Sequence, residues 1–418
     1  MRFLHLADLH LDAAFQNRSR ALRTRLRDAA RNALSSAIDQ ALSRQVDAVL
    51  IAGDLFDGDR LSVQTERFLF EALSRLAASN LQVVYATGNH DPGETLSALG
   101  IAWPDQVTVV DGPEPVQVEI RRGSEPVGLV TAAGHLKDRV TEDLSRRFPE
   151  AGGSLPEVGL LHTQVGGSVD ERGHDPYAPS ELSRLARSGF DYWALGHVHL
   201  RQALSDVPAI HYPGNTQGRN PREVGPKGGL YVDLARGAPT DPEFVELGPI
   251  RWETLEVSGL ENATDLTAVS KRIDMAWEEA RALDPGMDQT SWIVRVELTG
   301  PSTLHRDWMD RQALEELQEA SASSLGLLHV EVRADRLSPI TTADTYADRT
   351  DVLGEALRLT AELAEIDGPA PSEVLELRPE DLIGLSSEAG EDLDLYLRDL
   401  LKEGGTPLLE ALLRAGDR

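Results

Sequence analysis

The chain has 418 residues, with 41 Lys+Arg against 69 Asp+Glu and a formal net charge of -28, and its length predicts two or three globular domains. It contains no cysteine, which excludes disulfides, Cys-ligated zinc, iron–sulfur clusters and thiol nucleophiles. We expect no membrane span and a cytoplasmic location, because no apolar run approaches roughly 20 residues and MRFLHLADLH lacks the cleavage site of a secretory signal.

Short apolar runs bounded by polar residues or glycine recur through the first 250 residues. They lie at 2–7, 46–53, 82–88, 126–132, 158–162 and 191–196. Such runs are typical of strands buried on both faces of a sheet, which predicts an α/β domain. Amphipathic stretches separate the first three runs, with Leu22 and Leu26 on one apolar face and Leu69 and Leu73 on the next. We therefore expect right-handed helical crossovers, and a mixed or second sheet built by the later strands.

The pattern changes after residue 250, where a second group of strands and helices begins. Strands are predicted at 251–257, 291–299 and 327–333, and helices at about 265–284 and 304–321. This β-α-β-α-β order predicts a small α+β domain over 251–340, which follows a first domain over 1–250.

The last part of the chain, 341–418, is predicted to be an acidic helical tail. From residue 351 onward it carries 17 acidic and 6 basic residues. Residues 369–373 have the composition of a linker, and 391–404 and 409–416 have the spacing of short amphipathic helices. Because this charge would repel DNA, the tail either docks on a partner protein or forms a solvated surface.

Five of the predicted strands in the first domain end in side chains that can bind metal ions. These strand ends carry Asp8 and His10; Asp54; Asn89, His90 and Asp91; His162; and His197 and His199. Because ligands bind at the carboxyl ends of strands in open α/β sheets, we expect these distant segments to converge on one rim. Any one motif can arise as a turn, a helix cap or a surface histidine. Their conjunction in this order favours a single metal site.

The number and type of these side chains predict a pair of metal ions. Imidazole and oxygen ligands without thiolate suit Mn²⁺, Fe or Zn²⁺. The candidate ligands are Asp8, His10, Asp54, Asn89, His162, His197 and His199. These seven ligands are more than one ion needs and too few to coordinate two ions fully. They suffice for two ions if one residue binds both and water completes the coordination. A carboxylate is the natural bridge, so Asp54 is expected between two ions about 3.5–4 Å apart.

The ordered set D-X-H, G-D, G-N-H-D, H and G-H-X-H resembles the calcineurin-like metallophosphoesterase family over roughly residues 1–235. Within that family, ADLHLD, AGDLFD, TGNHD, LLHT and LGHVH are most similar to DNA double-strand-break repair nucleases of the bacterial SbcD and YhaO branches. YPGNTQGRNPREVGPKG, at 212–228, is particularly similar to the YhaO branch.

The resemblance implies an α/β (in some schemes α+β) sandwich of two sheets flanked by helices, with a small capping domain that contacts DNA. It also implies two divalent ions, for which we expect Mn²⁺, and a homodimer. The tail of such proteins engages an SMC-like ATPase, here expected to be of the SbcC/YhaN type.

The resemblance also implies roles for single residues. One ion would be held by Asp8, His10, Asp54 and His199, and the other by Asp54, Asn89, His162 and His197. His90 would contact the phosphate, stabilising the transition state or protonating the leaving oxygen, with Asp91 orienting its ring. Asp57 stands where some relatives carry a second catalytic histidine, so we assign it a structural role rather than acid–base work.

Basic residues near the metal motifs are candidates for contacts to DNA phosphates. Arg219, Arg222 and Lys227 lie in a Gly/Pro-rich loop soon after the last metal motif, although an ordinary surface loop would explain them equally well. Arginines between positions 18 and 31 share a helical face, for which a solvated outer surface is the slightly favoured explanation.

Three functions fit these motifs. The first is a Mn²⁺-dependent DNA-repair exonuclease or endonuclease that hydrolyses phosphodiester bonds with a metal-activated water and acts with an ATPase partner. The second is a phosphodiesterase or phosphatase for small phosphate esters, and the third is a non-catalytic protein that binds DNA or the ATPase. Competent residue types fill every predicted ligand position, so the sequence favours an enzyme, and we prefer the nuclease.

Overall fold

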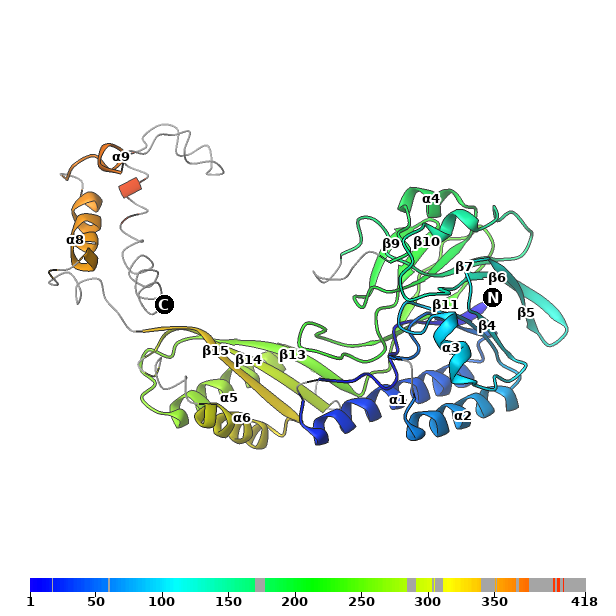
Figure 1. Cartoon of the computed structure of the whole chain (residues 1–418), viewed down its shortest axis with the longest axis horizontal. Coiled ribbons are helices and arrows are strands. Elements are labelled where there is room, and N and C mark those ends of the chain that lie inside the picture. The colour runs from blue at the N-terminus through cyan, green and yellow to red at the C-terminus, as the bar shows by residue number, and fades with distance from the viewer. Residues whose placement is uncertain are drawn as a thin grey trace. The chain divides into compact units, whose positions relative to one another are not determined.

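The computed structural model describes residues 1–16, 18–58, 61–169, 177–283, 291–302, 304, 311–339, 350, 352–365, 368–375, 394, 397, 398 and 401. The chain divides into two compact units, whose elements are labelled in Figure 1. The first unit comprises Met1–Thr254, Pro285–Arg295 and Leu327–His329. The second comprises Leu255–Asp284, Val296–Gly326 and Val330–Arg418.

The first unit contains two six-stranded mixed sheets. The first sheet has the order β12-β11-β1-β2-β3-β4. Its strands are β1 (Arg2–Leu6), β2 (Ala48–Ala52), β3 (Gln82–Ala86), β4 (Val107–Val110), β11 (Gly228–Asp233) and β12 (Glu243–Glu246). Strands β1 to β4 run parallel to one another, whereas β11 pairs antiparallel with both β1 and β12.

The second sheet has the order β5-β6-β7-β8-β10-β9. Its strands are β5 (Val116–Arg122), β6 (Glu125–Ala133), β7 (Glu157–His162), β8 (Tyr192–Gly196), β9 (Gln202–Asp206) and β10 (Ala209–Tyr212). Its four central strands are parallel, and the edge strands β5 and β9 pair antiparallel with their neighbours.

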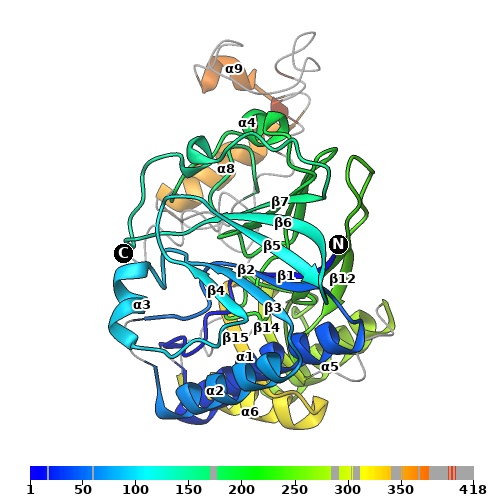
Figure 2. The same cartoon turned by 90° about the vertical axis from the view of Figure 1, so that its right-hand side faces the viewer.

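The two sheets face each other, and helices cover their outer faces (Figure 2). Helices α1 (Arg20–Ser43) and α2 (Val63–Ala78) pack on the first sheet, and the short α4 (Leu182–Arg187) packs on the second. In β2, Val49 and Ile51 face the helices while Leu50 faces the second sheet. Because strand side chains alternate, burial on both faces requires the uninterrupted apolar runs of the sequence.

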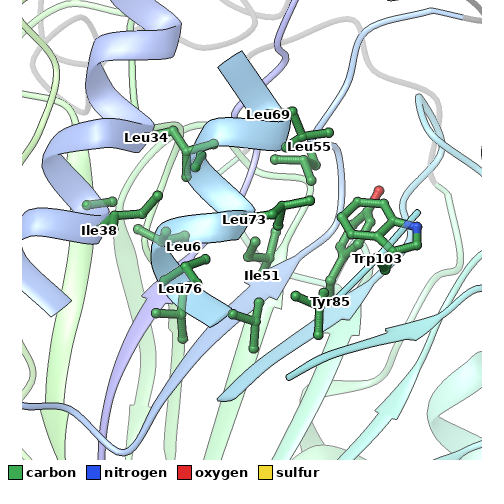
Figure 3. A pocket seen from close by; sticks show the side chains of 15 residues that line it. Leu6, Leu34, Ile38, Ile51, Leu55, Leu69, Leu73, Leu76, Tyr85 and Trp103 are labelled. Carbon is green, nitrogen blue, oxygen red and sulfur yellow. The ribbon is translucent and has the colours of Figure 1, made fainter. Parts of the chain in front are cut away.

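The layer between α1, α2 and the first sheet is formed almost entirely by aliphatic side chains, among them Leu34, Leu73 and Ile51 (Figure 3). Each such side chain contributes about 1.5–3 kcal/mol to the free energy of unfolding when it is buried. A cavity of about 30 Å³ remains here, and Tyr85 and Trp103 lie side by side at one end of it. Their ring centroids are 5.8 Å apart.

The structure confirms the predicted α/β sandwich of two mixed sheets flanked by helices. Each of the six apolar runs coincides with a strand, namely β1, β2, β3, β6, β7 and β8. The remaining strands of the two sheets were not predicted individually; they lie at or next to the edges of the sheets, and some carry exposed polar side chains. In β5, for example, Gln117, Arg121 and Arg122 are exposed.

The residues after β12 form a smaller set of elements, in which β13 (Ile250–Val257), β14 (Ser291–Ser302) and β15 (His329–Pro339) build one sheet. Helices α5 (Leu266–Leu283) and α6 (Arg311–Leu325) pack against each other. These elements overlap the ranges that the sequence predicts, although β15 extends to Pro339 rather than to residue 333, and α6 extends to Leu325 rather than to residue 321. The division into domains at 1–250, 251–340 and 341–418 stays a prediction.

The described part of the tail contains α8 (Val352–Ala364) and α9 (Pro371–Val374). The latter, a single turn, overlaps the predicted linker at 369–373, and Pro371 suits the first position of a helix. Apart from four single positions, the helices predicted at 391–404 and 409–416 lie outside the described residues. Within the described ranges, no helix combines the length and the hydropathy needed to cross a bilayer.

Candidate metal centre

The predicted metal-binding segments come together at one rim of the first unit. Strands β1, β2 and β3 are adjacent and parallel in one sheet, and β7 and β8 are adjacent and parallel in the other. Their carboxyl ends carry all the predicted ligands: Asp8, His10, Asp54, Asn89, His162, His197 and His199. All of these residues are buried except Asn89, which is partly exposed.

The backbone at these strand ends is unusual. Asp8 has φ 52°, His10 has φ 47°, Asp54 has φ 53° and His197 has φ 102°, in the left-handed region that non-glycine residues rarely adopt. Such conformations cluster at functional sites, where the surrounding structure maintains them. A Cβ on Gly88 would lie 2.2 Å from Asp54 Oδ1, so only glycine lets the loop after β3 approach this carboxylate.

One group of predicted ligands surrounds the nitrogens of His10 and His199. Their Nε2 atoms are 3.2 Å apart. His10 Nε2 is 3.7 Å from Asp54 Oδ2, and His199 Nε2 is 3.8 Å from Asp8 Oδ1. Asp8, His10 and His199 thus offer ligand atoms that all lie within 4.8 Å of one another.

A second group lies on the other side of Asp54. Its Oδ2 atom is 3.5 Å from His162 Nε2. Asn89 Oδ1 is 2.9 Å from the same nitrogen and 3.2 Å from His197 Nδ1. One oxygen of Asp54 therefore faces imidazoles of both groups, the position expected of a bridging carboxylate.

The hydrogen bonds of two histidines fix which ring nitrogen points into the centre. His162 donates its Nδ1–H to the Ala52 carbonyl at 2.8 Å, and His199 donates its Nδ1–H to Glu223 Oε1 at 3.0 Å. In the neutral rings, each Nε2 lone pair is then directed into the site. Asn89 Oδ1 and His162 Nε2 are consequently two acceptor atoms 2.9 Å apart, an arrangement that a cation would stabilise.

Burial determines the charge of this site. It lowers the pKa of His10, His162 and His199, which favours the neutral imidazoles that bind metals. Burial, followed by the nearby charge of Asp54, raises the pKa of Asp8 well above its usual value. Neutral imidazoles beside crowded carboxylates are a donor set that fits divalent cations, whose charge would relieve the repulsion.

His90 is placed at the exposed side of the centre. Its ring is 4.8 Å from that of His10, and its side chain is 39% exposed. It donates Nδ1–H to Asp57 Oδ1 at 2.7 Å. Burial alone would lower the pKa of His90, but the hydrogen bond to Asp57 and the charge of Asp54 outweigh it and raise the pKa to about 9.

The prediction that Asp91 orients the ring of His90 is wrong, because Asp57 does so. The Asp91 carboxylate instead points into the protein and accepts hydrogen bonds from the backbone N–H groups of Asp54, Leu55, Phe56 and Gly88 and from the Tyr85 hydroxyl. Asp91 thereby joins the loops after β2 and β3.

The three predicted phosphate contacts have different environments. Arg219 is close to the centre, with Nη1 3.5 Å from Asp57 Oδ2 and Nη2 3.4 Å from His199 Nδ1. Arg222 is exposed. Lys227 is 7% exposed and donates from Nζ to the His199 carbonyl at 3.5 Å, which corrects its prediction as a DNA contact.

Sequence reasoning missed Glu223, the buried carboxylate that holds His199. The signal was present as an acidic residue within the basic stretch 219–227, but only the basic residues there were considered. Two further histidines make structural contacts: His5 contacts Tyr192 and Leu195 in the core, and His135 contacts the His162 carbonyl at 2.8 Å. His174 and His305 lie outside the described residues.

The chain is similar to known metallophosphoesterases. Residues 1–201 match the family model described as calcineurin-like phosphoesterase. The chain is 32% identical over 287 residues to "Uncharacterized metallophosphoesterase YhaO" of Bacillus subtilis, covering 67% of this chain and 68% of the relative. It is 28% identical to the SbcD component of the SbcCD nuclease of Rhodobacter capsulatus, covering 65% of this chain and 76% of the relative.

A third similar protein is archaeal. "DNA double-strand break repair protein Mre11" of Aeropyrum pernix is 32% identical over 252 residues, which covers 57% of this chain and 59% of the relative.

Proposed function

Because this chain belongs to the calcineurin-like phosphoesterase family, we propose that it is a DNA-repair nuclease that hydrolyses phosphodiester bonds at a binuclear metal centre. The observation that carries the proposal is the position of Asp54 Oδ2, which lies 3.7 Å from His10 Nε2 and 3.5 Å from His162 Nε2. It can serve two ions at once. Asp8, His10, Asp54 and His199 would hold one ion, and Asp54, Asn89, His162 and His197 the other.

Two divalent cations, for which we propose Mn²⁺, would supply Lewis acidity to the phosphate and a nucleophilic water at neutral pH. His90 would donate from Nε2 to a phosphate oxygen or to the departing sugar oxygen. This nitrogen is available because Nδ1 is occupied by Asp57. Arg219 and Arg222 would contact the phosphate backbone, with Arg219 held near the reacting group by Asp57.

Support for DNA as the substrate comes from two relatives whose names describe a component of a nuclease and a double-strand-break repair protein. From the resemblance of its motifs to this nuclease family we also propose a homodimer that acts in the cytoplasm together with an SMC-like ATPase of the SbcC/YhaN type. The acidic tail would be the segment that docks on this ATPase. The negative charge of the tail would repel DNA, so a protein partner suits it better.

The proposal is tested by offering the purified protein, with Mn²⁺, linear duplex DNA, single-stranded DNA and an aryl phosphodiester. We expect cleavage of DNA, and loss of cleavage in Asn89→Ala. Turnover of the aryl ester with all DNA left intact would contradict the nuclease and favour an enzyme for small phosphate esters. Inactivity towards every substrate, with metal bound, would favour a non-catalytic binding protein.

A further inference from the structure

Glu223 lies in the segment between β10 and β11, and its side chain is buried. Its Oε1 atom accepts the Nδ1–H of His199 at 3.0 Å and an Asn220 Nδ2–H at 2.8 Å. Its Oε2 atom accepts from Asn215 Nδ2 at 2.6 Å and from the Arg219 backbone N–H at 2.7 Å. Both oxygens of this carboxylate are therefore surrounded by donors.

We propose that Glu223 is a positioning residue that holds His199 in the tautomer needed by the metal site of Asp8, His10 and His199. This inference rests on the proposed function, since it assumes a binuclear centre. A histidine that binds a metal through one nitrogen is commonly oriented by an acceptor at the other, and loss of that acceptor typically weakens metal affinity by about 10–100-fold.

The donor pattern requires a carboxylate at this position. A glutamine would present an NH₂ group either to His199 and Asn220 or to Asn215 and Arg219, and each of these partners is itself a donor. Leaving buried donors without an acceptor costs about 1–3 kcal/mol for each group. The hydrogen-bond donors around this position therefore explain why an acidic residue, Glu223, lies within the otherwise basic segment 219–227.

Glu223 also links the metal site to the residues on the phosphate side. The backbone of Arg219 is held by Glu223, and its guanidinium reaches Asp57, which orients His90. Loss of Glu223 would release His199 and the Arg219 segment together, while His162 keeps its own partner, the Ala52 carbonyl. The effect should thus be confined to one of the two ions.

The first experiment titrates Mn²⁺ into the wild type and Glu223→Ala, using calorimetry for affinity and electron paramagnetic resonance for coupling between ions. We expect two sites in the wild type. In Glu223→Ala, one site should keep its affinity, the other should weaken about 10–100-fold, and the coupled signal should be replaced by that of a mononuclear ion.

A matched control is Glu157→Ala. Glu157 is also a buried glutamate that holds a loop, because it accepts hydrogen bonds from the backbone N–H groups of Gly152 and Gly153. It is the first residue of β7, at the opposite end of the strand from the predicted ligand His162. Its loss should lower stability and leave both metal affinities unchanged. Should Glu223→Ala fail to fold, Glu223→Leu keeps most of the side-chain volume, offers no acceptor to His199 in any orientation and is expected to weaken the same single site.

The second experiment needs no metal. Nitrogen chemical shifts of ¹⁵N-labelled histidine in the metal-free protein report the tautomer, with His199 assigned by the signal missing from His199→Gln. We expect the Nδ1–H form in the wild type and a shift towards the Nε2–H form in Glu223→Ala, with no change in Glu157→Ala.

The two experiments separate the inference from the proposed function. Unchanged binding of both ions by Glu223→Ala, in a protein whose wild type binds two, would overturn the inference and leave the function standing. If the wild type binds no pair of ions, the proposed function fails. Whether or not the protein binds metal, an unchanged His199 tautomer in Glu223→Ala would overturn the inference.

Discussion

The Asp54 carboxylate lies between the two groups of predicted ligands, and its two oxygens have different partners. Oδ2 faces the Nε2 atoms of His10 and His162, while Oδ1 accepts the backbone N–H of His90 at 2.9 Å. Asp54 is thus both the predicted bridging ligand and the acceptor that fixes the backbone position of His90, the predicted general acid. A displacement of Asp54 would disturb both functions, whereas His90 can be removed without removing a ligand.

We predict that His90→Ala retains both metal ions and loses cleavage by about 10²–10⁴-fold, the usual contribution of a positioned acid or base. The side chain contacts Asp57 and lies beside His10, but it is not in either predicted ligand set. Metal content by mass spectrometry and the DNA cleavage rate check this prediction. Loss of the metals from His90→Ala would show that His90 is itself a ligand.

Asp57→Asn is the graded comparison for this prediction. The amide retains an oxygen that can accept from His90 Nδ1, so the ring stays in place while the carboxylate charge is lost. We expect a smaller decrease in the cleavage rate than for His90→Ala, with metal content unchanged. A rate equal to that of the wild type would mean that the charge of Asp57 contributes nothing to cleavage.

Asp91 joins the loops that follow β2 and β3, in addition to the contacts that His90 makes with Asp54 and Asp57. Backbone N–H groups of both loops converge on this one carboxylate, and Tyr85, at the end of the apolar cavity in Figure 3, donates its hydroxyl to it. The core beneath the first sheet and the rim of the metal centre are therefore connected through this buried acceptor.

We predict that Asp91→Asn weakens metal binding and lowers the free energy of unfolding by about 1–3 kcal/mol, because its NH₂ group would face backbone donors. Tyr85→Phe removes one donor and leaves the carboxylate, so we expect a loss of about 1 kcal/mol and nearly normal metal binding. Urea denaturation and Mn²⁺ calorimetry measure both effects. Normal metal affinity in Asp91→Asn would contradict the claim that Asp91 positions the metal-binding loops after β2 and β3.

Asp47, just before β2, connects the two sheets at the end away from the metal centre. It accepts the backbone N–H of Arg2 at 2.7 Å and a two-pronged interaction from Arg122 at 2.8 and 2.9 Å. Burial alone would raise the pKa of Asp47, but these donors outweigh it and hold the pKa below its usual value.

A lowered folded-state pKa stabilises the protein above the unfolded pKa of about 3.9, and this stabilisation is lost as the pH falls through the folded value. We therefore predict that Asp47→Asn is less stable than the wild type at pH 7 and that the difference shrinks in acid. Urea denaturation across pH measures it. The exposed pair of Asp39 and Arg75 is the control, since Asp39→Asn should change little at any pH.

At the scale of the whole molecule, the buried carboxylates and imidazoles of the rim oppose folding unless a cation accompanies them. Ions that bind only the folded chain stabilise it by about 2.7 kcal/mol at a concentration 100-fold above Kd. We predict that chelation of divalent ions lowers the Tm, that Mn²⁺ restores it, and that Asn89→Ala shows a smaller response. A Tm that is insensitive to chelator and Mn²⁺ would contradict the metal centre.

The sequence alone determined the sheets' central strands and the set of residues at the rim. Buried parallel strands require uninterrupted apolar runs, which are visible in the sequence. Ligands bind at the carboxyl ends of such strands, so the polar residues at the ends of the runs, such as Asp8, Asp54 and His162, are identifiable without coordinates. Edge strands such as β5 and β9 were not, because exposed strands need no apolar pattern.

Only the tertiary structure decided how these residues pair. Both Asp57 and Asp91 are candidates to orient His90 when residue type alone is considered, yet the fold directs one to the imidazole and the other to backbone donors. Lys227 and Glu223 lie in one segment, and the fold buries both around His199. Side-chain direction depends on left-handed backbone turns and on contacts between distant segments, and residue type and spacing contain neither.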